Sequence, residues 1–163
     1  MSFHILVVDD QREVSNAIHA KIKTLGADFT VATAMSGEEA MLEARLRKFD
    51  LLISEVRLPG MSGVELLRKL RIIKPDLKVI LTSTSIDRYI RREASDVGVE
   101  ILIEKPIVMG DLLSQIEGVL GIGEPPPPPP SEQDENGDEP SSISDRLSVM
   151  RRDVGRIARF VDQ

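Results

Sequence analysis

Polar side chains that could bind a metal ion and a phosphoryl group follow several apolar runs of this chain, each where the run ends. These side chains are Asp9, Asp10, Glu55, Thr82 and Lys105. Two or three carboxylates suit a hard divalent ion such as Mg²⁺, and a lysine and a hydroxyl beside that ion suit phosphoryl oxygens. Each residue alone says little, because aspartate and lysine are common in loops. Their joint pattern predicts a site for phosphate and metal, or the descendant of such a site.

Alternating strands and helices are needed to bring these side chains together. Apolar runs predict strands over residues 3–8, 28–32, 51–55, 78–82 and 101–104, and amphipathic stretches predict helices over 12–25, 36–47, 62–73, 87–96 and 109–120. Two of these helices open with a capping box, from Ser36 to Glu39 and from Ser62 to Glu65. We therefore expect an α/β fold with a parallel sheet covered on both faces. Ligands of such a sheet gather at the carboxyl ends of its strands.

Residues 1–123 resemble the receiver domain of bacterial response regulators, the CheY-like family. The resemblance rests on the segments 5–10, 50–63, 79–83 and 104–107, in this order. It implies a flavodoxin-like, doubly wound sheet of five parallel strands in the order 2-1-3-4-5. It also implies a role for each matching residue: Asp9 and Asp10 as magnesium-binding acids, the backbone carbonyl of Arg57 as a further metal ligand, Thr82 as the switch hydroxyl, and Lys105 as the lysine that contacts the phosphoryl group.

The chain departs from the family's pattern at two positions. The phosphorylated aspartate of the family falls on Glu55, and its aromatic switch residue falls on Leu102. The extra methylene of glutamate moves the attacking oxygen by about 1.5 Å, and a misplacement of about 1 Å can slow a reaction around 100-fold. We therefore expect Glu55 to accept phosphate poorly. The longer side chain should instead reach toward Lys105 and imitate part of a phosphorylated state.

These departures favour a non-enzymatic adaptor of two-component signalling, a pseudo-receiver that acts through protein–protein contacts. The alternative is a functional phosphoacceptor in a phosphorelay, which takes phosphate from a histidine kinase with Mg²⁺. We expect any Mg²⁺ binding to be weak, because Lys105 can neutralise Glu55 without the ion. No other cofactor is expected.

The composition of the chain argues against several classes of function and location. The net charge of −6 over 163 residues argues against a nucleic-acid partner. The absence of cysteine excludes disulfides and thiolate sites. No run approaches the roughly 18 apolar residues of a membrane span, and the first residues do not form a signal peptide. We therefore expect a cytoplasmic protein without stable membrane insertion.

The composition changes after Gly123. Residues 124–140 hold six consecutive prolines and six acidic residues, which predicts a disordered linker. Apolar residues in 141–163 are spaced alternately by four and three, which predicts an amphipathic C-terminal helix. This helix could pack on its own domain, form a homodimer or bind a separate protein. The residues expected to bind a partner are Leu147, Met150, Val154 and Ile157.

The expected partners are other proteins, either a histidine kinase or a downstream signalling protein. A second candidate surface is the fourth helix with the fifth strand and fifth helix, and it includes Tyr89, Arg91 and Arg92. The sequence leaves open the identity of the kinase, the downstream partner and the pathway. It also leaves open whether the chain is part of a longer protein.

Overall fold

Five strands and five helices alternate along residues 1–99 and 101–123, the residues that this computed structural model of the chain describes. The strands are β1 (Phe3–Val8), β2 (Phe29–Ala34), β3 (Leu51–Glu55), β4 (Lys78–Ser83) and β5 (Ile101–Glu104). The helices are α1 (Arg12–Lys23), α2 (Gly37–Leu46), α3 (Gly63–Ile73), α4 (Arg88–Asp96) and α5 (Met109–Leu120). The linker and the C-terminal helix predicted for 124–140 and 141–163 lie outside the described residues.

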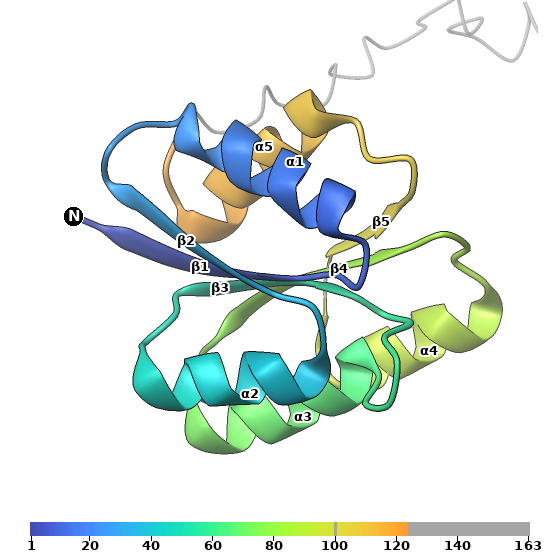
Figure 1. The fold of residues 1–163 in the computed structure, drawn as a ribbon. Coiled ribbons are helices and arrows are strands. Elements are labelled where there is room, and N and C mark those ends of the chain that lie inside the picture. Colours follow the sequence, from blue (N-terminus) through green and yellow to red (C-terminus); the bar gives the residue numbers. More distant parts are fainter. Residues whose placement is uncertain (100, 124–163) are drawn as a thin grey trace, which may run out of the picture. The chain divides into compact units, whose positions relative to one another are not determined.

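The strands form one parallel sheet in the order β2-β1-β3-β4-β5, which confirms the predicted fold class. Figure 1 shows α1 and α5 on one face of the sheet and α2, α3 and α4 on the other. Each of the first four helices leads from the end of one strand to the start of the next. The carboxyl ends of all five strands therefore meet at one edge of the sheet, and these connecting helices end near the opposite edge.

Each face of the sheet carries its own apolar core, because side chains alternate between the two faces of a strand. Val7 of β1 packs in the α1–α5 core with Ile18 and Ile116. Its neighbour Leu6 packs in the α2–α3–α4 core with Leu67. Strands buried on both faces read as continuous apolar runs, which is why β1 and β3 could be identified from the sequence.

Two predicted boundaries were wrong by a few residues. β2 spans Phe29–Ala34 and not 28–32, because it pairs with β1 along the whole of that strand. α1 ends at Lys23 and not at residue 25. The chain turns beyond it through Gly26, which has a φ of 129° that other residues rarely adopt. Among the described residues, no helix is long and apolar enough to cross a membrane.

Local hydrogen bonds fix the starts of the helices that follow the strands. Ser36 accepts a hydrogen bond from the backbone N–H of Glu39, and Ser62 accepts one from that of Glu65, both at 3.1 Å. Both predicted serine caps are thereby confirmed. The carboxylate of Glu39 turns back to the N–H of Met35 at 2.9 Å, one residue before the cap. These caps determine where the loops at the carboxyl edge of the sheet end.

Candidate functional site

Four polar side chains gather at the carboxyl ends of four strands. Asp9, Glu55, Thr82 and Lys105 follow β1, end β3, lie in β4 and follow β5. Each comes two positions after an apolar residue that packs in the α1–α5 core, namely Val7, Ile53, Ile80 and Ile103. Since side chains alternate along a strand, this spacing brings the four polar groups to the same side of the sheet.

Lys105 joins two buried carboxylates. Its Nζ lies 2.7 Å from Oδ2 of Asp9 and 2.6 Å from Oε2 of Glu55. Asp9 and Glu55 are 1% and 4% exposed, and the Lys105 side chain is 11% exposed. The contact with Asp9 is a hydrogen bond as well as an ion pair. The contact with Glu55 is an ion pair between the amine and the carboxylate.

Backbone N–H groups hold the other oxygen of each carboxylate. Oδ1 of Asp9 accepts a hydrogen bond from Gln11 at 2.8 Å, and Oε1 of Glu55 accepts one from Arg57 at 3.1 Å. Both acids are therefore fixed on two sides, by the lysine and by the loop that follows their strand. Such an arrangement offsets much of the cost of burying the charges.

The charge of Lys105 is strongly favoured. Burial of the amine lowers its pKa, but the hydrogen bonds and charges of Asp9 and Glu55 outweigh burial and raise the pKa above its ordinary value. Lys105 is therefore protonated throughout the neutral range. One positive charge faces two negative charges in this pocket.

The two predicted switch positions are both in the sheet. Thr82 lies beside Glu55 in the register of β3 and β4 and is 1% exposed. Leu102 lies beside Leu81 in the register of β4 and β5 and packs, partly buried, against the α2–α3–α4 core. The position of the aromatic switch residue therefore holds an aliphatic side chain that contributes to the core.

The side chain of Asp10 does not join this cluster, and the predicted role of Arg57 concerns its backbone carbonyl and not its side chain. Asp10 is exposed, and the guanidinium of Arg57 lies 3.4 Å from the hydroxyl of Ser85. Within the part of the chain that the structure describes, no three acidic, histidine or cysteine side chains are grouped so that they could hold a metal ion. Lys105 lies between the two buried acids, Asp9 and Glu55.

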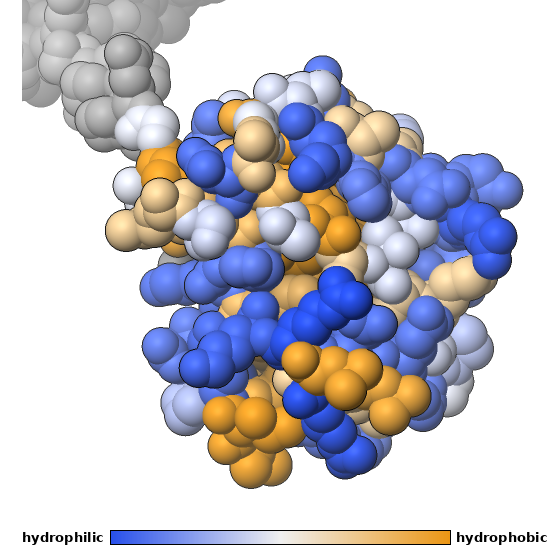
Figure 2. All heavy atoms as spheres, turned by 60° about the vertical axis from the view of Figure 1, so that its left-hand side comes forward, coloured by the Kyte–Doolittle hydropathy of each residue, from blue (hydrophilic) through white to orange (hydrophobic). Residues whose placement is uncertain are grey.

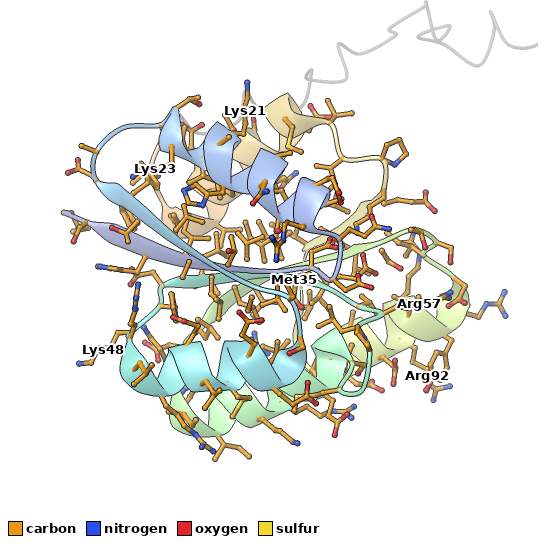
Figure 3. The ribbon with its side chains drawn as sticks, in the orientation of Figure 1. Lys21, Lys23, Met35, Lys48, Arg57 and Arg92 are labelled. Atoms are coloured by element: carbon orange, nitrogen blue, oxygen red, sulfur yellow. The ribbon has the colours of Figure 1, made fainter. Side chains whose placement is uncertain are left out.

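The predicted protein-binding residues of α4 lie at the surface. Tyr89 is 68% exposed, and Arg91 and Arg92 are exposed beside it. The Tyr89 hydroxyl donates a hydrogen bond to Glu93 at 3.1 Å, and this bond raises the pKa of Tyr89. Figure 3 labels Arg92 at the outer side of α4. All three side chains are accessible to another protein.

Gly63 is a part of the site that the sequence prediction did not identify. Its N–H donates to the carbonyl of Val56 at 2.8 Å, and an added Cβ would lie 2.2 Å from the carbonyl oxygen of Glu55. The first turn of α3 can therefore pack directly against the end of β3 only without a side chain. The only signal in the sequence was a glycine directly after the cap residue Ser62.

We predict that Gly63→Ala destabilises the domain by about 1–3 kcal/mol, the usual cost of overpacking a core. Gly118→Ala is a matched control, because Gly118 lies inside α5 with no other atoms within 4 Å of an added Cβ. The control should stabilise the helix by about 0.5–1 kcal/mol. Urea unfolding measures both changes. If Gly63→Ala did not lower the free energy of unfolding, α3 would be able to move away from Glu55 and make room for the added methyl group.

The fold agrees with what comparison with known proteins shows. Residues 5–117 match the family model of the response regulator receiver domain. The chain belongs to this family of two-component signalling domains. It is 34% identical over 121 residues to the response regulator MprA of Mycobacterium ulcerans, which covers 74% of this chain and 51% of that protein. It is 27% identical over 120 residues to the regulatory protein PhoP of Bacillus subtilis, with 74% and 49% covered.

Solved structures of receiver domains have a similar fold. A CheY-like receiver domain from Methanospirillum hungatei is 26% identical with a TM-score of 0.70, and the match covers 74% of this chain and 95% of that one. The chemotaxis protein CheY4 of Vibrio cholerae is also 26% identical, with a TM-score of 0.68 and with 73% and 99% covered. The chain spans about half the length of the curated relatives named above.

Proposed function

We propose that this chain is a signalling adaptor whose receiver domain acts without being phosphorylated, with Glu55 partly imitating a phosphorylated aspartate. The contact of 2.6 Å between Lys105 Nζ and Glu55 Oε2 carries this proposal. In the family, this lysine contacts the phosphoryl group. Here the carboxylate of Glu55 itself reaches the amine. The imitation is partial, because a carboxylate supplies one charge and an acyl phosphate carries nearly two.

The alternative is a receiver that still accepts phosphate with Mg²⁺. Incubation of the chain with acetyl phosphate and Mg²⁺, followed by mass spectrometry, distinguishes the two functions. Stoichiometric phosphorylation at Glu55 would overturn the pseudo-receiver proposal. Receiver domains typically bind Mg²⁺ at this site. We propose that this chain binds the ion weakly, because Lys105 already supplies the positive charge between Asp9 and Glu55.

An adaptor of this kind must act through contacts with other proteins in the cytoplasm. We propose that the C-terminal segment 141–163 makes the main contact, as an amphipathic helix whose apolar side chains enter a groove of the partner. The exposed residues of α4, Tyr89, Arg91 and Arg92, are the second candidate surface. A histidine kinase or a downstream signalling protein could occupy either surface.

The double change Leu147→Asp and Val154→Asp should abolish capture of a partner, because both residues belong to the predicted apolar stripe. Affinity capture with the tagged full chain, read by mass spectrometry, measures the effect. The control Ser144→Asp with Ser148→Asp adds the same charge between the positions of the stripe and should leave capture intact. Capture that survives the first pair, and is lost on changing Arg91 and Arg92, would assign the contact to α4.

A further inference from the structure

The outer surface of α2 and α3 exposes large apolar side chains that the proposed function does not use. Among the described residues, eight large apolar side chains are exposed, and four of them are Leu42, Leu46, Ile72 and Ile73. They are 59%, 78%, 83% and 57% exposed. We call these four residues the α2–α3 patch. Figure 2 shows orange side chains gathered over the lower half of the domain, which holds α2 and α3.

The four exposed residues of the patch lie on two helices that contact each other. Scattered surface leucines need no explanation, but exposed apolar residues gathered on two neighbouring helices indicate an interaction surface. Leu42 and Leu46 are four residues apart and therefore lie on one side of α2. Ile72 and Ile73 end α3. The patch is separate from the ion pair of Lys105 and from the exposed residues of α4.

Acidic and basic residues lie toward opposite ends of α2 and α3. Acidic residues lie in the first turns, with Glu38 in α2 and Glu65 in α3. Basic residues follow the helix ends, with Arg47 and Lys48 after α2 and Lys74 after α3. The three basic residues line a cavity of about 370 Å³ between the two helix ends. Apart from Glu43 in α2, which pairs with Arg47, and from Arg68 and Lys69 in the middle of α3, the surface is acidic at the start of both helices and basic at their ends. The apolar residues lie toward the basic end.

A surface with this order is complementary to itself. Because α2 and α3 each connect the end of one parallel strand to the start of the next, they run in the same direction. A two-fold axis across the helices turns the second copy end to end. The acidic end of each copy then faces the basic end of the other, while the apolar residues meet between them. Such an interface, with the same patch on both subunits, is typical of symmetric dimers.

We propose that the α2–α3 patch binds a second copy of this chain in a two-fold symmetric dimer. The dimer covers the four apolar side chains with each other and pairs Glu38 of one copy with Lys48 of the other, while Arg47 keeps its ion pair with Glu43 of its own chain at 3.6 Å. It leaves the site of Lys105 and the exposed face of α4 free. The chain could therefore dimerise and bind another protein at the same time.

Sedimentation velocity of the full chain, from micromolar to near-millimolar concentration, tests this proposal. The sedimentation coefficient should rise with concentration from that of a monomer to that of a dimer. The double change Leu46→Lys and Ile72→Lys should weaken dimerisation at least about tenfold, since it places four like charges in the interface. Val108→Lys is the matched control, because Val108 is similarly exposed, at 62%, and belongs to neither the patch nor the named residues of α4. Circular dichroism checks that all variants stay folded.

Charge reversal tests the orientation of the dimer. Glu38→Lys alone and Lys48→Glu alone should each weaken dimerisation severalfold, and the two changes together should restore it. A chain that stays monomeric over the whole concentration range overturns the proposal. Unchanged dimerisation of the Leu46→Lys, Ile72→Lys variant also overturns it, since another part of the chain must then join the copies.

Discussion

Replacing Glu55 by aspartate should turn a chain that takes up almost no phosphate into one that is phosphorylated by acetyl phosphate and Mg²⁺. The shorter side chain moves the attacking oxygen back by about 1.5 Å, a C–C bond length. Since about 1 Å of misplacement can cost around 100-fold in rate, we expect Glu55→Asp to be phosphorylated at least about 100 times faster than the wild type. Asp9, Thr82 and Lys105 remain in place around the new acceptor.

Intact-mass measurement over time gives both rates, and fragmentation assigns the phosphate to a residue. Glu55→Ala is the control, because it removes the carboxylate and should never be labelled at this position. Equal labelling of the wild type and of Glu55→Asp would contradict the pseudo-receiver proposal. Labelling of neither chain would place the loss of acceptance elsewhere, for example at the exposed Asp10.

Replacing Lys105 by methionine should destabilise the domain by about 3–5 kcal/mol, the usual result of removing one partner from a buried ion pair. Asp9 and Glu55 would stay buried with no cation between them. Lys78→Met is the control, because Lys78 is exposed at the start of β4 and should change stability by less than about 0.5 kcal/mol. Adding Glu55→Gln to Lys105→Met should recover part of the loss, since only one buried carboxylate then remains.

Urea unfolding at several pH values separates this electrostatic effect from lost packing. The folded state holds the proton of Lys105 more tightly than the unfolded chain does, because its pKa is raised. The stabilisation is therefore complete below the ordinary lysine pKa of about 10.5 and is lost as the pH rises through the higher folded-state pKa. The difference between the wild type and Lys105→Met should stay constant through neutral pH and shrink only in strong alkali. A difference that does not depend on pH would indicate lost packing alone.

The sequence predicted the fold well because its signals are local. The apolar runs of β1 and β3 and the capping serines Ser36 and Ser62 each depend on residues close together in the chain. The end of β2 was harder to predict. Phe29–Ala34 contains two threonines, and its length is set by pairing with β1, which lies far away in sequence.

The residue types of the site and the reach of Glu55 toward Lys105 were predicted, but the other contacts of the site were not. The family resemblance predicted that Asp9, Glu55 and Lys105 lie close together, and they do. Each of them ends or follows a strand, and the carboxyl ends of the strands meet at one edge of the sheet. The outward position of Asp10 depends on a loop conformation that its residue type does not determine. The role of Gly63 depends on two backbone segments that meet only in the folded domain. Contacts of this kind leave no periodic pattern in a single sequence.

The division of the domain into two apolar cores affects how the protein can evolve. The acids and the lysine of the site follow strand residues of the α1–α5 core, while α4 rests on the α2–α3–α4 core through Ile90 and Ala94. The exposed residues of α4 contribute to neither core. Their identities can therefore drift, or be redesigned, without loosening the buried ion pair. A lineage of such chains could acquire new binding partners while its charged centre stays the same.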